Sequence, residues 1–324
     1  MLRGVTTPRV RGPICFIGDV HGCTDKLKRL WDKLPGVVGG MEAFEKLNIV
    51  FLGDYCDKGP DTRGTLDFVS SLEQNFPEQN HFFLAGNHDF AFSCFLGLLG
   101  QHSQLDLSPT WRQKYASRVK GEKLYDGPGY EKMHLQGLRY ATSSRSIFNS
   151  ESTFESYGVP YGDRVALLEA IPEEHKKFFN NLQWILEMKS NVGDIIAVHA
   201  GLENDSDKIA TQIESLRNRE SHYLMKPFIE PLCGRANVER MPQQLMAPVL
   251  KKRGVLPPPL FLISGHHGFI RIDGRRIILD SCAGRADKDM SALVLKREGN
   301  SKSHHALSNE QGLAIQVFSS RLSF

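Results

Sequence analysis

The stretch ICFIGDVHG, residues 14–22, decides the fold, because an apolar run ends in a glycine beside two metal-binding residue types. Four apolar residues without polar alternation are typical of a strand that is buried on both faces. Asp19 and His21 follow this run, and in extended chain alternate side chains share one side of the backbone. These two side chains can therefore converge on one ion beyond the carboxyl end of the strand, where sites form in α/β folds.

The same pattern of an apolar run followed by polar residues beside glycine recurs four times. The four later copies are NIVFLGDYCDKG (48–59), FFLAGNHD (82–89), DIIAVHAGL (194–202) and LFLISGHHG (260–268). Apolar residues at helical spacing fill the intervals 24–34, 61–76 and 88–99. We therefore predict an α/β fold that starts as β-α-β-α-β-α and presents five strand ends to one site.

In the rest of the chain the sequence signal for secondary structure is weaker. We predict helices at 163–188 with a break at Pro172, and at 206–222 and 238–250, and strands at 275–279, 291–296 and 313–318. Residues 1–12 are predicted to be a flexible leader, residues 13–298 the domain, and residues 299–324 a C-terminal tail with one late strand. Residues 100–160 interrupt the strand–helix rhythm, and we predict a small helical or irregular insertion there.

Composition excludes several classes of protein. The 324 residues carry a net charge of +3, which is too small to indicate nucleic-acid binding by charge alone. No run approaches the roughly 18 apolar residues of a membrane span. The six cysteines form no CxxC pair, which favours reduced thiols in the cytoplasm, with the nucleus as a second location.

The five strand ends together supply carboxylate, amide and imidazole side chains. This donor set suits Mn, Fe or Zn rather than a thiolate-preferring ion. Asp54 can bridge two ions through its two oxygens, so the prediction is a pair of transition-metal ions. The predicted ligands are Asp19, His21, Asp54, Asn87, His199 and His266.

The ordered motifs GDVHG, GDYCDKG, GNHD, VHAGL and GHHG, which span residues 18–268, resemble those of the calcineurin-like metallophosphoesterases. Within these, the chain is similar to the PPP family of phosphoprotein phosphatases. The resemblance implies a β-sandwich flanked by helices with two metals at one edge. It also implies that His88 is the proton donor and that Asp57 orients it.

Three departures narrow the resemblance. Eukaryotic Ser/Thr members usually have Arg at the position of Lys58 and Glu at that of Asp89, and LDSCAGR (279–285) replaces their late Tyr-rich stretch. The pattern is closest to the second type of plant Rhizobiales-like phosphatases. That group is associated with phosphotyrosine, so we expect phosphotyrosine hydrolysis, including in doubly phosphorylated Thr/Tyr motifs.

The phosphoryl group needs fixed positive partners, because its equatorial oxygens carry the charge. Lys58 follows Asp54 and Asp57 on one loop and is the first candidate. It is a point charge without the two-pronged geometry of arginine, so further cations are required. We predict Arg235 for this role, and Arg219 after it.

Several alternatives stay open. The same metal set serves Ser/Thr phosphatases, diadenosine-tetraphosphate-type pyrophosphohydrolases and binding modules that have lost catalysis. Cys23 and Arg29 have the spacing of a cysteine-based phosphatase, but the residues between them lack glycines for an amide cradle. The basic stretch 111–123 fits either a solvated helix face or a docking site for an acidic or phosphorylated partner, and the expected partner is a phosphoprotein.

Overall fold

The structure is a computed structural model of the chain. It describes residues 7–98, 134–135, 146, 148–204, 209–219, 230–246, 258–297 and 313–321. The basic stretch 111–123 lies outside these ranges. Among the described residues, no helix has both the length and the apolar character needed to cross a membrane.

The first sheet has five strands in the order β11-β10-β2-β3-β4. Three of its strands run parallel, as the apolar runs predict: β2 (Ile14–Ile17), β3 (Asn48–Phe51) and the edge strand β4 (Asn80–Phe83), which begins two residues before its predicted run. β10 (Ser291–Arg297) pairs antiparallel with β2, and β11 (Leu313–Ser319) extends the edge. The predicted late strand is therefore confirmed, and it belongs to this sheet rather than to a separate tail.

The second sheet has six strands in the order β1-β5-β6-β7-β9-β8. β6 (Asp194–Ala197), β7 (Leu260–Ser264) and β9 (Arg276–Leu279) are parallel neighbours. The hairpin strand β8 (Ile270–Asp273) lies at one edge, and β5 (Leu186–Ser190) with β1 (Arg9–Val10) lies at the other.

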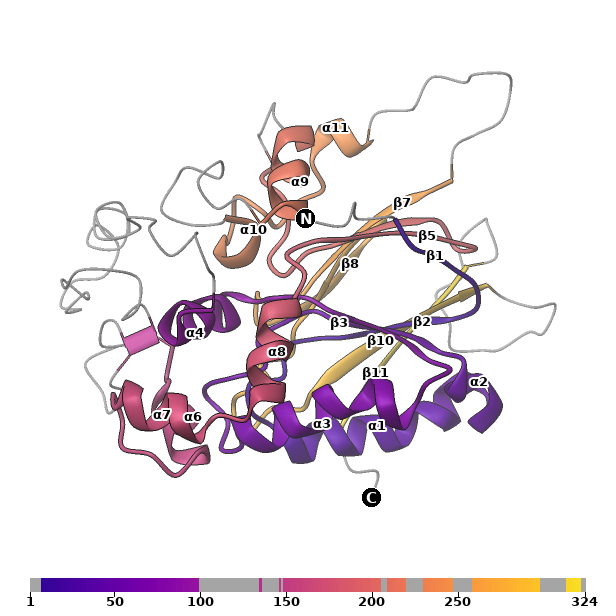
Figure 1. The fold of residues 1–324 in the computed structure, drawn as a ribbon. Helices are drawn as coiled ribbons and strands as arrows, with labels where there is room; N and C mark the ends of the chain where they lie inside the picture. Colours follow the sequence, from indigo (N-terminus) through magenta and orange to yellow (C-terminus); the bar gives the residue numbers. More distant parts are fainter. Residues whose placement is uncertain are drawn as a thin grey trace.

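The two sheets pack face to face around an apolar core (Figure 1). Phe16 and Val50 of the five-stranded sheet join Ile195, Phe261 and Ile277 of the six-stranded sheet in this core. Alternate residues of the same strands point the opposite way, into the helix-facing core. Burial on both faces explains why these strands read as continuous apolar runs in the sequence.

Helices cover the outer faces of the sandwich. Figure 1 places α1 (Thr24–Val38), α2 (Met41–Glu45) and α3 (Thr62–Asn75) along the five-stranded sheet. α9 (Ile209–Arg217), α10 (Glu230–Cys233) and α11 (Gln243–Met246) lie on the side of the six-stranded sheet. The remaining helices are α4 (Asn87–Leu96), α6 (Glu151–Ser156), α7 (Arg164–Ala170) and α8 (Glu173–Asn181). The predicted fold class, an α/β sandwich flanked by helices, is confirmed.

Two segment predictions need correction. The helix predicted over 163–188 ends at Asn181, and the chain then forms β5, because Leu186 and Met188 alternate into the inter-sheet core. In the helix predicted over 238–250, the residues before Pro242 form an irregular loop and α11 begins only at Gln243; residues 247–250 lie outside the described ranges.

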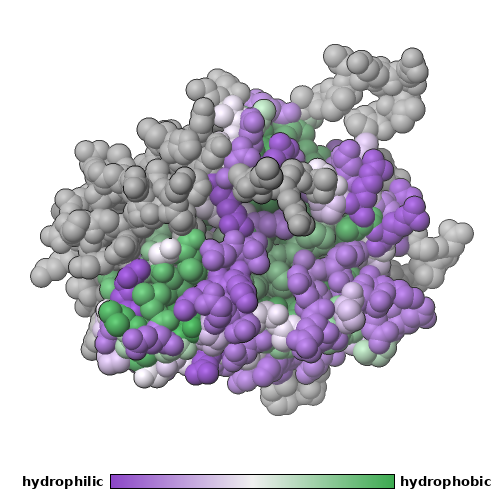
Figure 2. All heavy atoms as spheres, viewed as in Figure 1, coloured by the Kyte–Doolittle hydropathy of each residue, from purple (hydrophilic) through white to green (hydrophobic). Residues whose placement is uncertain are grey.

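The predicted leader and insertion differ in part from expectation. Val10 is buried, and β1 pairs with β5, so the end of the leader is part of the sandwich. Of the insertion, the structure describes a 3-10 turn at 134–135 and the segment 148–160, which holds α6. In the view of Figure 2 the surface is mostly hydrophilic, with an apolar area over α6 and α7.

Candidate active site

The five predicted strand ends meet at one edge of the sandwich. Two of their loops approach so closely that neither tolerates a side chain at its glycine. Gly53 has a φ of 103°, and a Cβ there would lie 2.5 Å from the backbone nitrogen of Gly86. A Cβ on Gly86 would in turn lie 2.0 Å from Oδ1 of Asp54. The glycines therefore let the loops after β3 and β4 pack against each other beside the ligands.

Asp54 lies at the centre of the site. Its Oδ2 is 3.4 Å from Nε2 of His21, 3.4 Å from Nε2 of His199 and 3.9 Å from Nε2 of His88. Its Oδ1 accepts a hydrogen bond from the backbone N–H of His88 at 3.0 Å. One carboxylate oxygen thus faces imidazoles from three different strand ends, which is the position that a bridging ligand requires.

Two groups of potential ligand atoms share Asp54, and the first of them includes His88, the predicted proton donor. His21, Asp54 and His88 offer ligand atoms within 4.8 Å of one another, and so do Asp54, His199 and His266. Asp19 holds the second group to the first, because its Oδ1 accepts the backbone N–H of His266 at 2.9 Å.

The residues present fit metal ions. Among the described residues, three buried ligand atoms have no hydrogen-bond partner: Oδ1 of Asn87, Nε2 of His199 and Nε2 of His266. A buried polar atom without a partner is costly, so these atoms need an electrophile at this place. Together with the carboxylates of Asp19 and Asp54 they form a mixed oxygen and nitrogen donor set, which suits first-row transition metals.

The imidazole tautomers also fit metal binding. Nδ1 of His21 lies 3.1 Å from the carbonyl oxygen of Cys56, and Nδ1 of His199 lies 2.6 Å from that of Leu52. A carbonyl can only accept, so each Nδ1 carries a proton, and Nε2 is the nitrogen of each ring that faces the site. Hydrogen bonds of this kind fix both the tautomer and the ring orientation of a metal ligand.

Electrostatics at the site are dominated by buried charge. Burial disfavours the charged form of Asp54, but His199 and His88 outweigh it and hold the pKa of Asp54 well below its usual value. For His199, burial is outweighed by Asp54 and Asp19, which raise its pKa to about 9. Burial and the nearby Arg235 lower the pKa of His266 well below its usual value.

His88 and Asp57 form a buried pair beside this centre. Nδ1 of His88 donates to Oδ2 of Asp57 at 2.8 Å, which leaves Nε2 of the ring directed toward Asp54. Burial, the largest effect, lowers the pKa of His88 to about 4. His134 and His88 together overcome burial and lower the pKa of Asp57, so it remains a carboxylate.

Of the three cations predicted to bind phosphate, the structure brings two to the site. Nζ of Lys58 lies 2.6 Å from Nε2 of His21, and Arg235 donates to the carbonyl oxygen of His266 at 2.6 Å. Because one lone pair cannot serve two partners, a metal on His21 would turn Lys58 toward the phosphate position. The prediction for Arg219 needs correction: its guanidinium donates to the carbonyl of Asn180 at the end of α8 and contacts no ligand among the described residues.

Backbone strain is concentrated at the site. The described residues other than glycine with φ in the left-handed region include His21 at 50°, Asp54 at 58°, Asp57 at 71°, Lys58 at 63° and His266 at 71°. Such conformations cost about 1–3 kcal/mol each and persist where the surrounding structure holds them. Here they turn the chain sharply at the strand ends and direct the side chains inward.

Sequence analysis missed three supporting residues. His134 lies 2.7 Å from Oδ1 of Asp57, and Thr153 donates to the same oxygen at 2.6 Å. Neither follows a strand or a glycine, so no pattern could have indicated them. Asp89 accepts from the backbone N–H groups of Asp54, Tyr55 and Gly86, and its place as the last residue of the GNHD motif was the available signal.

The structure disfavours the cysteine-based alternative. Cys23 is the residue before α1, and its thiol donates to the carbonyl oxygen of Ala283 at 3.1 Å. Burial is the main reason that the pKa of this thiol is raised, so it is held away from the thiolate form that acts as a nucleophile.

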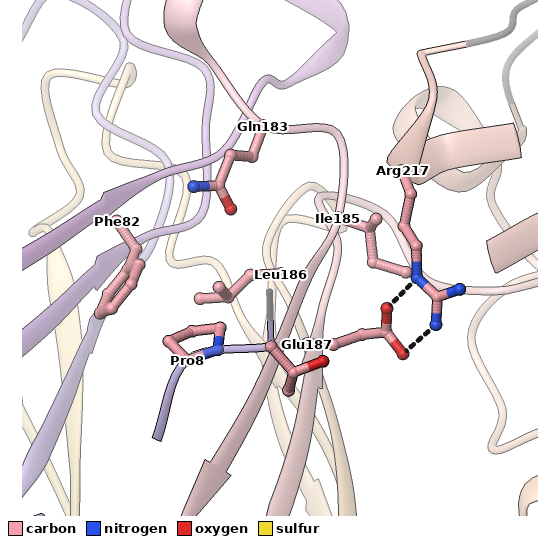
Figure 3. A pocket seen from close by; sticks show the side chains of 8 residues that line it. Pro8, Phe82, Gln183, Ile185, Leu186, Glu187 and Arg217 are labelled. Atoms are coloured by element: carbon pink, nitrogen blue, oxygen red, sulfur yellow. Dashed lines mark hydrogen bonds and ion pairs between the residues drawn. The ribbon is translucent and has the colours of Figure 1, made fainter. Parts of the chain in front are cut away.

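A separate pocket lies beside β1 and β5 and contains none of the predicted ligands. Its lining includes Pro8, Phe82, Gln183 and Leu186 (Figure 3). Its two charged side chains, Glu187 and Arg217, form an ion pair with each other at 2.7 Å. This pocket offers no unpaired carboxylate or imidazole to a metal, so the strand-end cluster is the candidate active site.

Comparison with known proteins agrees with this geometry. The chain is 36% identical over 80 residues to the serine/threonine-protein phosphatase PP1-delta of Caenorhabditis elegans, and 36% identical over 77 residues to the bis(5'-nucleosyl)-tetraphosphatase PrpE of Oceanobacillus iheyensis. These matches cover 25% and 23% of this chain, and only 24% and 30% of those relatives' own lengths.

A solved protein serine/threonine phosphatase from Saccharomyces cerevisiae has a similar fold. Its TM-score is 0.50 at 14% identity, over 96% of this chain and 83% of that chain. At this level of identity the likeness supports the fold alone. The family model of the calcineurin-like phosphoesterases matches residues 12–267, which contain all six predicted metal ligands. The chain therefore belongs to the calcineurin-like phosphoesterase family.

Proposed function

We propose that the protein is a dinuclear-metal protein phosphatase that hydrolyses phosphotyrosine. The observation that carries this proposal is the convergence of Asp19, His21, Asp54, Asn87, His199 and His266 from five strand ends around one bridging carboxylate. Members of its family are metal-dependent hydrolases, so the hydrolytic chemistry follows from membership. The protein substrate and the tyrosine preference are the proposed part.

The ligands divide into two groups that share Asp54. His21 and Asp19 would hold one ion with it, and Asn87, His199 and His266 the other. When bound, such a pair of ions supplies an activated water and neutralises charge on the phosphoryl oxygens. Mn, Fe and Zn all suit this donor set.

The protein's own residues then bind the phosphoryl group and protonate the leaving oxygen. Lys58 contacts His21 and Arg235 contacts the His266 carbonyl, so each cation lies beside a different ligand, from which it can contact equatorial oxygens. His88 would act in its doubly protonated form: it gives the Nε2 proton to the leaving oxygen and keeps the Nδ1 proton, which the Asp57 carboxylate accepts and which stabilises the imidazolium before transfer.

Three features favour a tyrosine substrate. A single lysine replaces the arginine that Ser/Thr-directed relatives usually have, so the phosphate clamp at this loop is weaker and less directional. A phenol leaving group, with a pKa of about 10, departs more easily than an alkoxide and depends less on such a clamp. In addition, the ring of Phe269 is 37% exposed beside His267, where an aryl group can pack. The stretch LDSCAGR (279–285), which stands where Ser/Thr-directed relatives have a Tyr-rich stretch, points the same way.

A direct assay separates the candidate functions. Purified protein loaded with Mn²⁺ is tested on phosphotyrosine, phosphoserine, phosphothreonine and doubly phosphorylated Thr/Tyr peptides, and on diadenosine tetraphosphate. We expect the highest kcat/KM on peptides that carry phosphotyrosine, and loss of activity with chelator. A preference for diadenosine tetraphosphate would replace the proposal with a nucleotide hydrolase, the activity named for the PrpE relative. Activity that survives full metal removal would refute the metal mechanism.

A further inference from the structure

A second buried histidine touches the proton-donor pair. His134 belongs to the 3-10 turn at 134–135 and is fully buried. Its Nε2 lies 2.7 Å from Oδ1 and 2.8 Å from Oδ2 of Asp57, the carboxylate that also binds His88. We propose that His134 is a positioning residue, supplied by the insertion, that locks Asp57 and thereby aims His88 at the leaving oxygen. This inference rests on the proposed function, since it acts only through His88.

The proton arrangement around Asp57 follows from the available partners. Nδ1 of His134 has no hydrogen-bond partner among the described residues, so the ring proton is on Nε2 and is donated to the carboxylate. Asp57 then accepts from three side chains: His88, His134 and Thr153. A carboxylate with donors on both oxygens cannot rotate without breaking a hydrogen bond, and the His88 ring direction is fixed with it.

The ring of His134 is itself held in an apolar box. Aromatic rings surround it at centroid distances of 4.9 Å (Phe92), 5.9 Å (Phe95), 6.0 Å (Phe148) and 6.4 Å (Phe154). Phe148 also packs edge-on against His88 at 5.0 Å. The hydroxyl of Ser150 donates to the His134 carbonyl at 2.9 Å. Such enclosure makes the hydrogen bond to Asp57 strong, because water cannot compete for it.

A metal ion is the alternative use of these atoms. Cys56, Asp57 and His134 have ligand atoms within 4.8 Å of one another. Cys56 is poorly suited, because burial, followed by the nearby Asp57, raises the pKa of its thiol well above its usual value and disfavours the thiolate. The contact of 2.7 Å between Nε2 of His134 and Oδ1 of Asp57 is a direct hydrogen bond.

The test is a double-mutant cycle between His88 and His134. His134→Phe keeps the ring volume and removes the donor, whereas His134→Gln keeps an N–H donor near the Nε2 position. On a phosphoserine peptide, we expect His134→Phe to lower kcat by about 10–100-fold, the range for residues that orient a functional group through a hydrogen bond. We expect a smaller loss on an aryl phosphate with an acidic phenol, restoration of most of the lost rate by His134→Gln, and no further loss in a His88→Ala background.

Three results would overturn the inference. The first is that His134→Phe lowers kcat by the same factor for all leaving groups. The second is that His134→Gln is as slow as His134→Phe. The third is that His134→Phe lowers kcat further in the His88→Ala background. Elemental analysis that finds a third metal in the wild type, absent from His134→Gln, would assign the residue to a metal site instead. The single variant His88→Ala tests the proposed proton donor by itself. A failure of the proposed function can therefore be distinguished from a failure of the inference about His134.

A variant of another buried histidine, His175, serves as the control for effects on folding. His175 is buried between Tyr157 and Asp67 and has no contact with Asp57 among the described residues. His175→Phe therefore reports the effect of losing a buried histidine, and we expect the dependence on the leaving group to stay unchanged. If His134→Phe does not fold, Thr153→Val removes another donor to Oδ1 of Asp57 and should give the same leaving-group pattern with a smaller loss.

Discussion

The two edges that form the active site are held by buried charges of opposite sign. We call the loops after β2, β3 and β4 the acid edge, because they carry Asp19, Asp54 and Asp57. We call the loops after β6 and β7 the imidazole edge, because they carry His199 and His266. Asp89 lies behind the acid edge and Arg276 behind the imidazole edge, and both are buried.

Each of these residues ties backbone groups together, but with opposite hydrogen-bonding roles. Asp89 accepts from the N–H groups of Asp54 at 2.6 Å, Tyr55 at 2.8 Å and Gly86 at 2.8 Å. Arg276 donates to the Ser264 hydroxyl and to backbone carbonyls on four segments of the chain: Ala200, Val238, Glu239, Leu262 and Ile277. Asp89 therefore joins two loops of one sheet. Arg276 joins both imidazole-bearing loops to the segment that carries Arg235.

The difference has an energetic consequence. The acid edge places several carboxylates in one buried region, and like charges there repel each other strongly because the surroundings are apolar. Cations at Asp54 relieve this repulsion. The imidazole edge is stabilised by a cation that belongs to the protein itself. Proton transfer and the relief of repulsion by metal ions should therefore reside on the acid edge, whereas the imidazole edge supplies ligands on a rigid support.

The largest expected effect tests the chemistry of the acid edge. His88→Ala should slow phosphoserine hydrolysis by about 10²–10⁴-fold, the usual contribution of a general acid, and should slow an aryl phosphate much less. Arg235→Ala, on the imidazole edge, should slow both substrates by the same factor, because phosphate binding does not depend on the leaving group. Steady-state kinetics on both substrates measure this difference. If His88→Ala slowed both substrates by the same factor, proton transfer could not be assigned to the acid edge.

The next effect tests the support of the imidazole edge. Arg276→Met should lower the free energy of unfolding by at least about 3 kcal/mol, since several buried carbonyls lose their donor at about 1–3 kcal/mol each. Arg271→Met is the matched control on the neighbouring strand, because Arg271 is partly exposed and pairs with Glu239 at 3.3 Å. We expect at most about 1 kcal/mol for this control. Urea titrations of both variants provide the measurement, and equal losses would contradict the assigned role.

A smaller effect sharpens the electrostatic part of the comparison. Asp89→Asn keeps one acceptor oxygen and removes a negative charge, so the metal-loaded protein should lose about 1–2 kcal/mol of stability from the weakened hydrogen bonds. In chelator the loss should be smaller, because removal of this charge relieves repulsion with Asp54. Thermal melts of the variant and the wild type, each with and without Mn²⁺, test this. The exposed Asp25 in the first turn of α1 supplies the control, since Asp25→Asn should behave alike in both conditions.

How much of this could be read from the sequence depends on the kind of pattern involved. Strand ends such as GDVHG are local, so Asp19 and His21 were predictable and are found at the site with the other strand-end ligands. β5 was misread as helix because its alternation is only five residues long and follows a true helix. The feature that identifies β5 as a strand is the burial of Leu186 and Met188 against the opposite sheet. This feature is visible only in the folded structure.

Supporting contacts between distant segments were beyond prediction. His134 reaches Asp57 across 77 positions of the chain, and nothing in its neighbourhood distinguishes it from a core histidine. Arg276 lies on a strand that was predicted correctly, but its burial among carbonyl groups depends on how three loops pack together. By contrast Arg219 was predicted from its residue type alone, and residue type does not say where a side chain points.

The smallest expected effect lies away from both edges and tests whether acid sensitivity comes only from the site. His81 on β4 stacks against Trp31 and Phe83, and burial lowers its pKa to about 4 from an ordinary value of 6.5. Between these two pH values the unfolded chain binds a proton that the folded chain does not, so stability falls as the pH drops from 6.5 toward 4. In His81→Phe, measured in chelator so that metal loss does not contribute, the melting temperature should fall less over this range than in the wild type. The same slope in both proteins would mean that His81 does not contribute to the acid sensitivity.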